Sequence, residues 1–343
     1  MKRFPLILAV IAAVIELFAM AGLGAAASVD ELVAAAKKEG ALNFYAPSTL
    51  TPEGAQQVGQ AFNKKYDLNV RVTYFPSGSM TQEVGKLISQ AAAGVTPEYD
   101  LMAIIDALHG HLWLKKLHAP FDYAKLGVDP RAIHYDNGTV SFANQVVLPA
   151  YNERVLDPQD VPTRWEDLLA PKWKGKKIGI PTATGQIDFL AIKWGEKKVV
   201  EFAQALARQE PIPGRLAELY TRLQVGEILL TSTMLDSFIH RSKKKGAPLA
   251  QAQLQPVISP AYHAGVLKGA RHPNTAHLFT AFLTSPEAQR IWEKHGGETS
   301  AFVPGTPMYN YAKDKDMIYL SQKDAEMVNR LVDEFGRIFG FRR

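Results

Sequence analysis

The sequence contains no cysteine, and this absence excludes several kinds of chemistry. Without thiols the chain has no disulfides, thiolate nucleophiles, iron–sulfur clusters or cysteine zinc sites. A lipid-anchored lipoprotein is excluded as well, because its anchor is attached to a cysteine. The lack of cysteine leaves the compartment open, since an oxidising periplasm permits disulfides without requiring them.

The sequence also lacks a large excess of charge of one sign. Its 39 lysines and arginines stand against 34 acidic residues, so the formal net charge is +5 over 343 residues. This charge is too dilute for a chain that neutralises the phosphates of a nucleic acid, and we expect no nucleic-acid partner. With 47% hydrophobic and 21% charged residues, the chain can bury a sizeable core. It should fold as about two domains.

Motifs of known catalytic sites are missing too. The sequence has no P-loop, no H-E-x-x-H and no nucleophile elbow. The stretch GLGAAA at residues 22–27 has no strand before it, so it is not a dinucleotide-binding fingerprint. We therefore expect a protein that is not an enzyme and that carries no cofactor.

The nine histidines raise the question of a metal site. His109 and His111 are the closest pair, and His118 is nearby. Residues two apart on a helix point about 200° away from each other, so this pair could not face one ion. We expect these histidines to have surface or capping roles, and we expect no metal site.

The amino terminus indicates export. A basic pair at residues 2–3 precedes an apolar stretch at residues 4–21, and small residues follow at 25–27. This order is typical of a signal peptide, and Glu16 interrupts the run, which argues against a membrane anchor. We expect cleavage after Ala27. No later segment approaches the 18 consecutive apolar residues of a membrane span, so the mature protein should be exported and not membrane-embedded.

The first part of the mature chain alternates helix and strand. Ser28 and Glu31 form a capping box for a helix that ends at Gly40. Strands are expected at 41–46, 68–75 and 99–106, with helices starting near Thr51 and Ser79 between them. Strands separated by helices predict right-handed crossovers and a parallel sheet.

A second set of alternating elements follows residue 139. Residues 140–152 are extended, and Thr163 and Glu166 form a second capping box. Strands then lead into helices near Gln186 and again within residues 226–240. An extended segment at 249–267 precedes two helices and an amphipathic carboxyl-terminal helix. The fold class is therefore α/β in both parts of the chain.

Several stretches in this order resemble the type 2 periplasmic solute-binding proteins of ABC importers. They are YDLMAIIDA, LPAYNERVL, WEDLLAPKWKGKKIGIP, HPNTAHLFTAFLTSPEAQRIW and the terminal FGRIFG. Together they look most like the branch that contains ferric-iron binding proteins and their organic-solute relatives. The resemblance implies two lobes with a cleft between them and two extended crossover segments. It divides the chain into a signal peptide (1–27), the first part of lobe 1 (28–139), crossover and lobe 2 (140–264), a return to lobe 1 (265–300) and a carboxyl-terminal segment (301–343).

Ligand-binding residues are expected where strands end and helices begin. Unpaired backbone N–H groups and a partial positive charge meet there, at the carboxyl edge of each sheet. The resemblance further implies that the crossovers, near residues 140–152 and 255–267, pass behind the ligand, with Tyr151, Asn152 and Tyr262 on or beside them. The candidates are Ser48, Thr49, Ser77, Gly78, Ser79, Asp106, Tyr151, Asn152, Thr182, Thr184, Gly185, Gln186, Ser232, Thr233, Asp236 and Tyr262. For Ser79 and Thr184, helix capping alone would also select a hydroxyl.

The ligand class can be narrowed by comparison with the ferric-binding members, which present two adjacent tyrosines after the strand that corresponds to GEILLTS. This chain has Asp236 and Ser237 there, and Tyr309 and Tyr311 fall beyond the expected cleft segments.

Helix starts rich in serine, threonine and glycine favour an anionic group, and the aspartates could accept hydrogen bonds from hydroxyl or amine groups. We expect a small polar, anionic or zwitterionic organic solute, an inner-membrane ABC permease as partner, and a monomer. Ferric iron or an iron chelate is the alternative ligand, and a periplasmic enzyme is a distant alternative.

Overall fold

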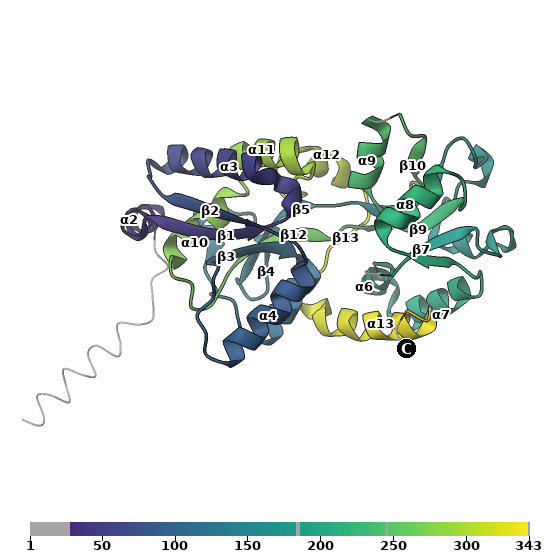
Figure 1. Ribbon diagram of the computed structural model, residues 1–343, viewed down its shortest axis with the longest axis horizontal. Coiled ribbons are helices and arrows are strands. Elements are labelled where there is room, and N and C mark those ends of the chain that lie inside the picture. Colours follow the sequence, from purple (N-terminus) through teal and green to yellow (C-terminus); the bar gives the residue numbers. More distant parts are fainter. Residues whose placement is uncertain (1–27, 183–185, 245, 342–343) are drawn as a thin grey trace, which may run out of the picture.

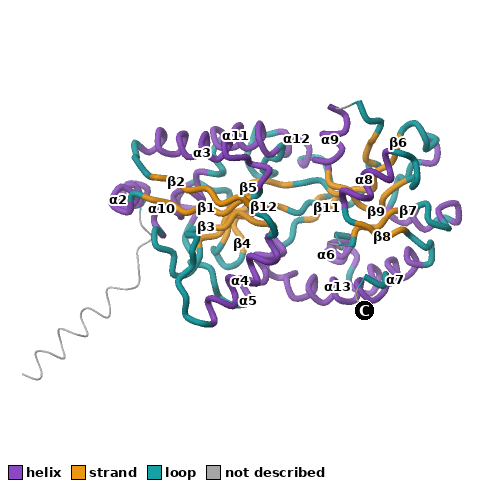
Figure 2. The backbone as a smooth tube through the Cα atoms, in the orientation of Figure 1, coloured by secondary structure: helices purple, strands orange, loops and turns teal. Residues whose placement is uncertain are grey.

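The computed structural model describes residues 28–182, 186–244 and 246–341. The described chain forms two α/β lobes that lie side by side (Figure 1). Each lobe is built on one sheet with helices packed around it (Figure 2). The expected signal peptide, with Thr184 and Gly185, lies outside the described residues. None of the helices within the described ranges has both the length and the apolar composition needed to span a bilayer.

The first lobe contains a six-stranded sheet in the order β2-β1-β3-β12-β5-β4. Its strands are β1 (Ala41–Ala46), β2 (Arg71–Pro76), β3 (Leu101–Ile105), β4 (Ile133–His134), β5 (Thr139–Asn144) and β12 (Ala261–Val266). As predicted, β1 pairs in parallel with β2 and β3. The sheet is mixed, because β12 pairs antiparallel with β3 and β5, and β4 antiparallel with β5.

The helices of the first lobe are α2 (Val29–Glu39), α3 (Thr51–Tyr66), α4 (Met80–Ala92), α5 (Asp106–Leu114), α10 (Pro273–Phe282) and α11 (Pro286–Gly296). Of these, α2, α3 and α4 begin near the predicted residues. The Ser28 capping box opens α2, and Gly40 ends it with a φ of 64°, a conformation that favours glycine. Phe44, Phe62 and Phe279 are fully buried, and their rings pack edge to face.

The second lobe contains a sheet in the order β13-β11-β6-β9-β7-β8, with β10 paired to β6. Its strands are β6 (Val147–Asn152), β7 (Ile178–Pro181), β8 (Ile212–Gly214), β9 (Leu230–Leu235), β10 (Leu249–Gln251), β11 (Val257–Ile258) and β13 (Met317–Ile318). The helices are α6 (Ala191–Trp194), α7 (Glu196–Ala207), α8 (Leu216–Gln224), α9 (Asp236–Lys244), α12 (Pro307–Ala312) and α13 (Ala325–Ile338). β7 pairs in parallel with β8 and β9, and Trp165 and Trp173 are among the largest buried side chains.

Short 3-10 helices complete the described chain. They are η1 (Ser48–Leu50), η2 (Tyr123–Leu126), η3 (Pro130–Ala132), η4 (Pro158–Asp160), η5 (Trp165–Leu169), η6 (Pro171–Trp173), η7 (Ile187–Leu190) and η8 (Gln322–Asp324). The capping box expected from Thr163 and Glu166 is wrong. Asp167 is the acidic residue that accepts from the N–H and the hydroxyl of Thr163, at 2.9 and 3.0 Å.

Two adjacent segments carry the chain between the sheets. Residues 145–146 lead from β5 to β6, and residues 259–260 lead from β11 to β12. The N–H of Gln145 donates to the carbonyl of Pro260 at 2.9 Å, which ties the two crossings together. The chain passes a third time at residues 297–306, after which β13 pairs with β11. Finally, α13 packs against α7 of the second lobe and also contacts α5 of the first (Figure 1).

Candidate interlobe binding site

The carboxyl ends of the parallel strands in both lobes face the junction between the lobes (Figure 1). In the first lobe, the loops after β1 and β2 lie together, since the N–H of Ser48 donates to the Ser77 hydroxyl at 3.2 Å. Gly78 and Ser79 follow at the surface, and the Ser79 hydroxyl accepts from the Gln82 N–H, capping α4. The capping role considered for Ser79 is therefore present in the structure.

A cavity of about 500 Å³ lies between the lobes. Thr49 and residues 293–298 line it from the first lobe, and Asp236, Ser237 and Arg241 line it from the second. A smaller cavity of about 310 Å³ adjoins it and shares Asp236 and Glu298. We call the smaller one the hinge cavity; it is lined by Asn144, Val146, Asp236, Gln251, Gln253, Gly297, Glu298, Thr299, Pro307, Met308 and Tyr311.

Asp236 and Glu298 form an acidic pair with one member from each lobe. Asp236 begins α9, and its Oδ1 accepts from the Ser237 N–H at 2.9 Å. Burial raises the pKa of Asp236 to about 6. Glu298 is only 5% exposed, and burial raises its pKa to about 7, with the charge of Asp236 adding to the rise. The site therefore holds two carboxyl groups that resist being ionised together.

Asp106 and Asp188 form a second acidic pair across the lobes. Asp106 begins α5, and its two carboxyl oxygens accept from the N–H groups of Ala107 and Ala261, at 2.8 and 3.0 Å. Asp188 lies in η7, and both side chains are 1% exposed. Burial raises the pKa of each carboxyl to about 7, and the charge of Asp188 adds to the rise at Asp106. Asp106 thus holds the start of β12 in place through its hydrogen bond to Ala261.

The remaining second-lobe candidates are spread along the strand ends. Thr182 is exposed after β7, and its N–H donates to the Gly214 carbonyl at 3.0 Å. Gln186 precedes η7 with a φ of 41° and is 8% exposed. Its Oε1 has no hydrogen-bond partner in the described part of the chain. Gln186 is therefore an unused buried acceptor directly before η7, two residues before Asp188.

Some predicted placements are wrong. Ser232 and Thr233 do not follow β9 but lie inside it, fully buried, with hydroxyls that lack a partner among the described residues. Tyr151 and Asn152 lie at the far end of β6, where Tyr151 pairs with Leu230 at the start of β9. They were expected at the crossover, but the chain crosses at residues 145–146, before β6 begins.

Tyr262 has the predicted position, at the start of β12 directly after the second crossing. Three residues near the junction were missed. Asp188 is a charged residue within the apolar stretch 187–192, so it could have been found from the sequence. Glu298 and Tyr311 have no comparable local signal. The expectation that Tyr311 lies beyond the cleft is wrong, because it lines the hinge cavity with Asp236.

The expectation of surface or capping roles is wrong for His109 and His118, which are both buried. His109 is fully buried, and its Nδ1 lies 3.0 Å from His118 Nε2 while its Nε2 lies 2.9 Å from the His263 carbonyl oxygen. Burial lowers the pKa of His118 to about 4, so the pair is neutral. Within the described ranges, no group of three or more histidine or acidic side chains is placed to hold a metal ion.

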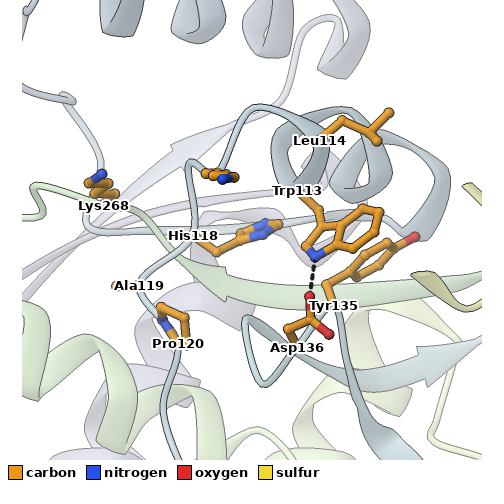
Figure 3. A pocket seen from close by; sticks show the side chains of 9 residues that line it. Trp113, Leu114, His118, Ala119, Pro120, Tyr135, Asp136 and Lys268 are labelled. Atoms are coloured by element: carbon orange, nitrogen blue, oxygen red, sulfur yellow. Dashed lines mark hydrogen bonds between the residues drawn. The ribbon is translucent and has the colours of Figure 1, made fainter. Parts of the chain in front are cut away.

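A further cavity of about 610 Å³ lies beside His118 in the first lobe (Figure 3). Trp113 and Tyr135 line it, and the Trp113 indole donates to Asp136 at 2.8 Å. None of the candidate ligand residues that the structure describes lines this cavity. It is separate from the junction between the lobes.

Two α/β lobes, paired crossings and a cavity lined from both sides define a two-lobed fold of the kind that binding proteins use. A family model of bacterial extracellular solute-binding proteins matches residues 42–298. The chain therefore belongs to this family of bacterial extracellular solute-binding proteins, which confirms the expected resemblance.

Solved structures agree with this fold. Iron-bound HitA from Pseudomonas aeruginosa is 18% identical, with a TM-score of 0.67 over 87% of this chain and 99% of that chain. Trichodesmium FutA, in complex with iron and citrate, is 20% identical with a TM-score of 0.69, over 88% and 99%. AfuA from Actinobacillus pleuropneumoniae, with fructose-6-phosphate bound, is 20% identical with a TM-score of 0.66, also over 88% and 99%.

One curated relative is an uncharacterized protein from Haemophilus influenzae, 29% identical over 153 residues. The match covers 41% of this chain and 42% of that protein, so the chain spans less than half the length of this relative.

Proposed function

We propose that this protein is the periplasmic substrate-binding component of an ABC importer. It captures a small polar, anionic or zwitterionic organic solute between its lobes and delivers it, as a monomer, to an inner-membrane permease. The observation that carries the proposal is the cavity of about 500 Å³ that Thr49 lines from one lobe and Asp236 from the other. A solute held from both sides stabilises the closed arrangement of the lobes and thereby shifts the hinge equilibrium.

Family membership and the solved neighbours support this proposal. The neighbours with citrate and fructose-6-phosphate show that related folds hold polar organic anions. On this chain, the hydroxyls of Thr49 and Ser77 and the helix starts nearby supply uncharged donors for such groups. The basic pair at residues 2–3 and the apolar stretch after it supply the signal for export.

Hinge closure is the first testable consequence. Small-angle scattering of the purified protein should give a smaller radius of gyration when the retained solute is added, because the lobes close around it. The control is a solute of similar size that the protein does not retain. An unchanged radius at saturation with the retained solute would contradict the hinge mechanism.

A ferric-iron site is the second candidate, and Tyr311 is the observation in its favour, because this phenol lines the hinge cavity with two carboxyl groups. The adjacent tyrosine pair of the ferric-binding relatives is still missing from the sequence. Burial also raises the pKa of Tyr311 to about 12, with the charge of Asp236 adding to the rise, which disfavours a phenolate. Titration with a weak ferric chelate should therefore produce no phenolate-to-iron absorption band. A strong band that saturates at one iron per protein would establish the iron site instead.

A further inference from the structure

The hinge cavity contains polar atoms that nothing in the described chain satisfies. They are Asn144 Nδ2, Glu298 Oε2 and Tyr311 OH. All three residues line the same cavity of about 310 Å³. Asn144 is 2% exposed and Glu298 is 5% exposed, so bulk water does not replace the missing partners. Buried polar atoms without partners are costly, and three of them around one cavity indicate a bound group.

In Asn144 and Glu298, the hydrogen bond of one side-chain atom shows what the other, unpartnered atom can do. Asn144 Oδ1 accepts from the Ala301 N–H at 2.9 Å, which directs Nδ2 as a donor away from that contact. Glu298 Oε1 accepts from the Gln145 side-chain amide at 3.3 Å, which leaves Oε2 as a free acceptor. The cavity thus offers one donor, one carboxylate acceptor and a hydroxyl that can act as either.

The charge around the cavity favours a cation. Asp236 enters from the second lobe and Glu298 from the first, and the charge of Asp236 acts on Glu298. Arg241 also acts on Glu298, but its side chain is exposed and lines only the larger cavity. A cation between the two carboxyls would remove their mutual repulsion and hold the lobes together.

We propose that the hinge cavity binds an ammonium group of the solute between Asp236 and Glu298. A hydrogen-bond acceptor on the same solute, such as a carboxylate or hydroxyl oxygen, receives the N–H of Asn144. The inference rests on the proposed function and narrows the solute class to amines and zwitterions. A bare metal ion fits less well, because the Asn144 donor would face it and only two of the described residues that line the cavity carry a carboxyl group.

Matched solutes test the inference on the purified full-length protein. Ethanolamine is compared with ethane-1,2-diol, and β-alanine with propionate, by calorimetric titration and by the midpoint of thermal unfolding. In each pair, the first molecule carries an amino group and the second does not. We expect the amines to bind and to raise the midpoint, while the partners without an amino group bind at least about tenfold more weakly, since a buried charged hydrogen bond is lost.

Variants test whether Asp236 and Glu298 are the residues that bind the amine. Glu298→Gln keeps the size of the side chain and an acceptor for Gln145 but removes the charge, and it should lower amine affinity at least about tenfold. Asp236→Asn should act in the same direction. Glu326→Gln is the control, because it removes the same charge from an exposed residue of α13 that lines neither cavity. Thermal unfolding without solute checks that each variant is folded.

Equal binding of amines and their partners, binding of neither, or unchanged amine affinity in the Glu298→Gln variant would overturn the inference. Protection by calcium or magnesium chloride alone would overturn it in favour of a metal site. If the protein nevertheless retains a solute without an amino group from a mixture of metabolites, the proposed function stands and only the ammonium site fails. If it retains no solute, the proposed function fails as well.

Discussion

Replacing Asp188 with asparagine is expected to stabilise the ligand-free protein, and to do so more strongly as the pH rises. Burial raises the pKa of Asp188 from its ordinary 3.8 to about 7. Between pH 3.8 and about 7 the folded protein therefore keeps a proton on this carboxyl that the unfolded chain has released. As the pH rises through this range, the wild-type carboxyl lowers the free energy of unfolding. From pH 5 to pH 8 the difference in free energy of unfolding between the variant and the wild type should grow by about 2 to 3 kcal/mol in favour of the variant.

The comparison with the wild type at each pH is essential, because buried histidines act in the opposite direction. Burial lowers the pKa values of His118 and His134 to about 4, so their neutral forms add stability as the pH rises from about 4 to 6.5. These contributions cancel in the difference between variant and wild type. Urea unfolding across this pH range measures that difference, with exposed Asp314→Asn as the control. A difference that does not change with pH would show that Asp188 is ionised in the folded protein.

The second large effect is expected at Gly265, the residue before the last of β12. A Cβ atom at this position would lie 2.7 Å from His109 Cε1 and 2.9 Å from Thr139 Cγ2. His109 cannot move aside easily, because both of its ring nitrogens are held by the contacts to His118 and the His263 carbonyl. Gly265→Ala should therefore lower the free energy of unfolding by about 2 to 3 kcal/mol through overpacking.

Gly85→Ala provides the matched control for Gly265→Ala. Gly85 lies in α4, and a Cβ atom there would meet nothing within 4 Å. Alanine should stabilise this helix by about 0.5 to 1 kcal/mol. Both variants are compared by urea unfolding. Equal stability of Gly265→Ala and the wild type would mean that the packing of His109 against β12 is looser than described.

The features that could be predicted from the sequence depend on local signals. The Ser28 cap, the αL glycine at 40 and the strand at 41–46 are each determined by a few neighbouring residues, and the structure has them where they were expected. The site was predicted less well, because it depends on contacts between distant segments. Tyr311 reaches Asp236 only because the chain passes between the lobes a third time at residues 297–306.

The errors in the site have the same origin. The position of Tyr151 and Asn152 follows from where β6 begins, and that start depends on the pairing of β6 with β9. His109 is buried because β12, more than 140 residues later in the chain, pairs with β3 and brings the His263 carbonyl to its ring. No spacing within residues 109–118 contains that information. Glu298 likewise depends on a distant residue, because it accepts a hydrogen bond from Gln145, 153 residues earlier in the chain.

Retention of a solute tests the central proposal most directly. The purified protein is incubated with a defined mixture of polar metabolites, separated from free solutes by gel filtration and denatured, and the released molecules are identified by mass spectrometry. The account predicts that a small polar solute is retained at one molecule per protein and is released chemically unchanged. Retention of no solute, or release of a chemically altered one, would contradict the assignment as a solute-binding protein.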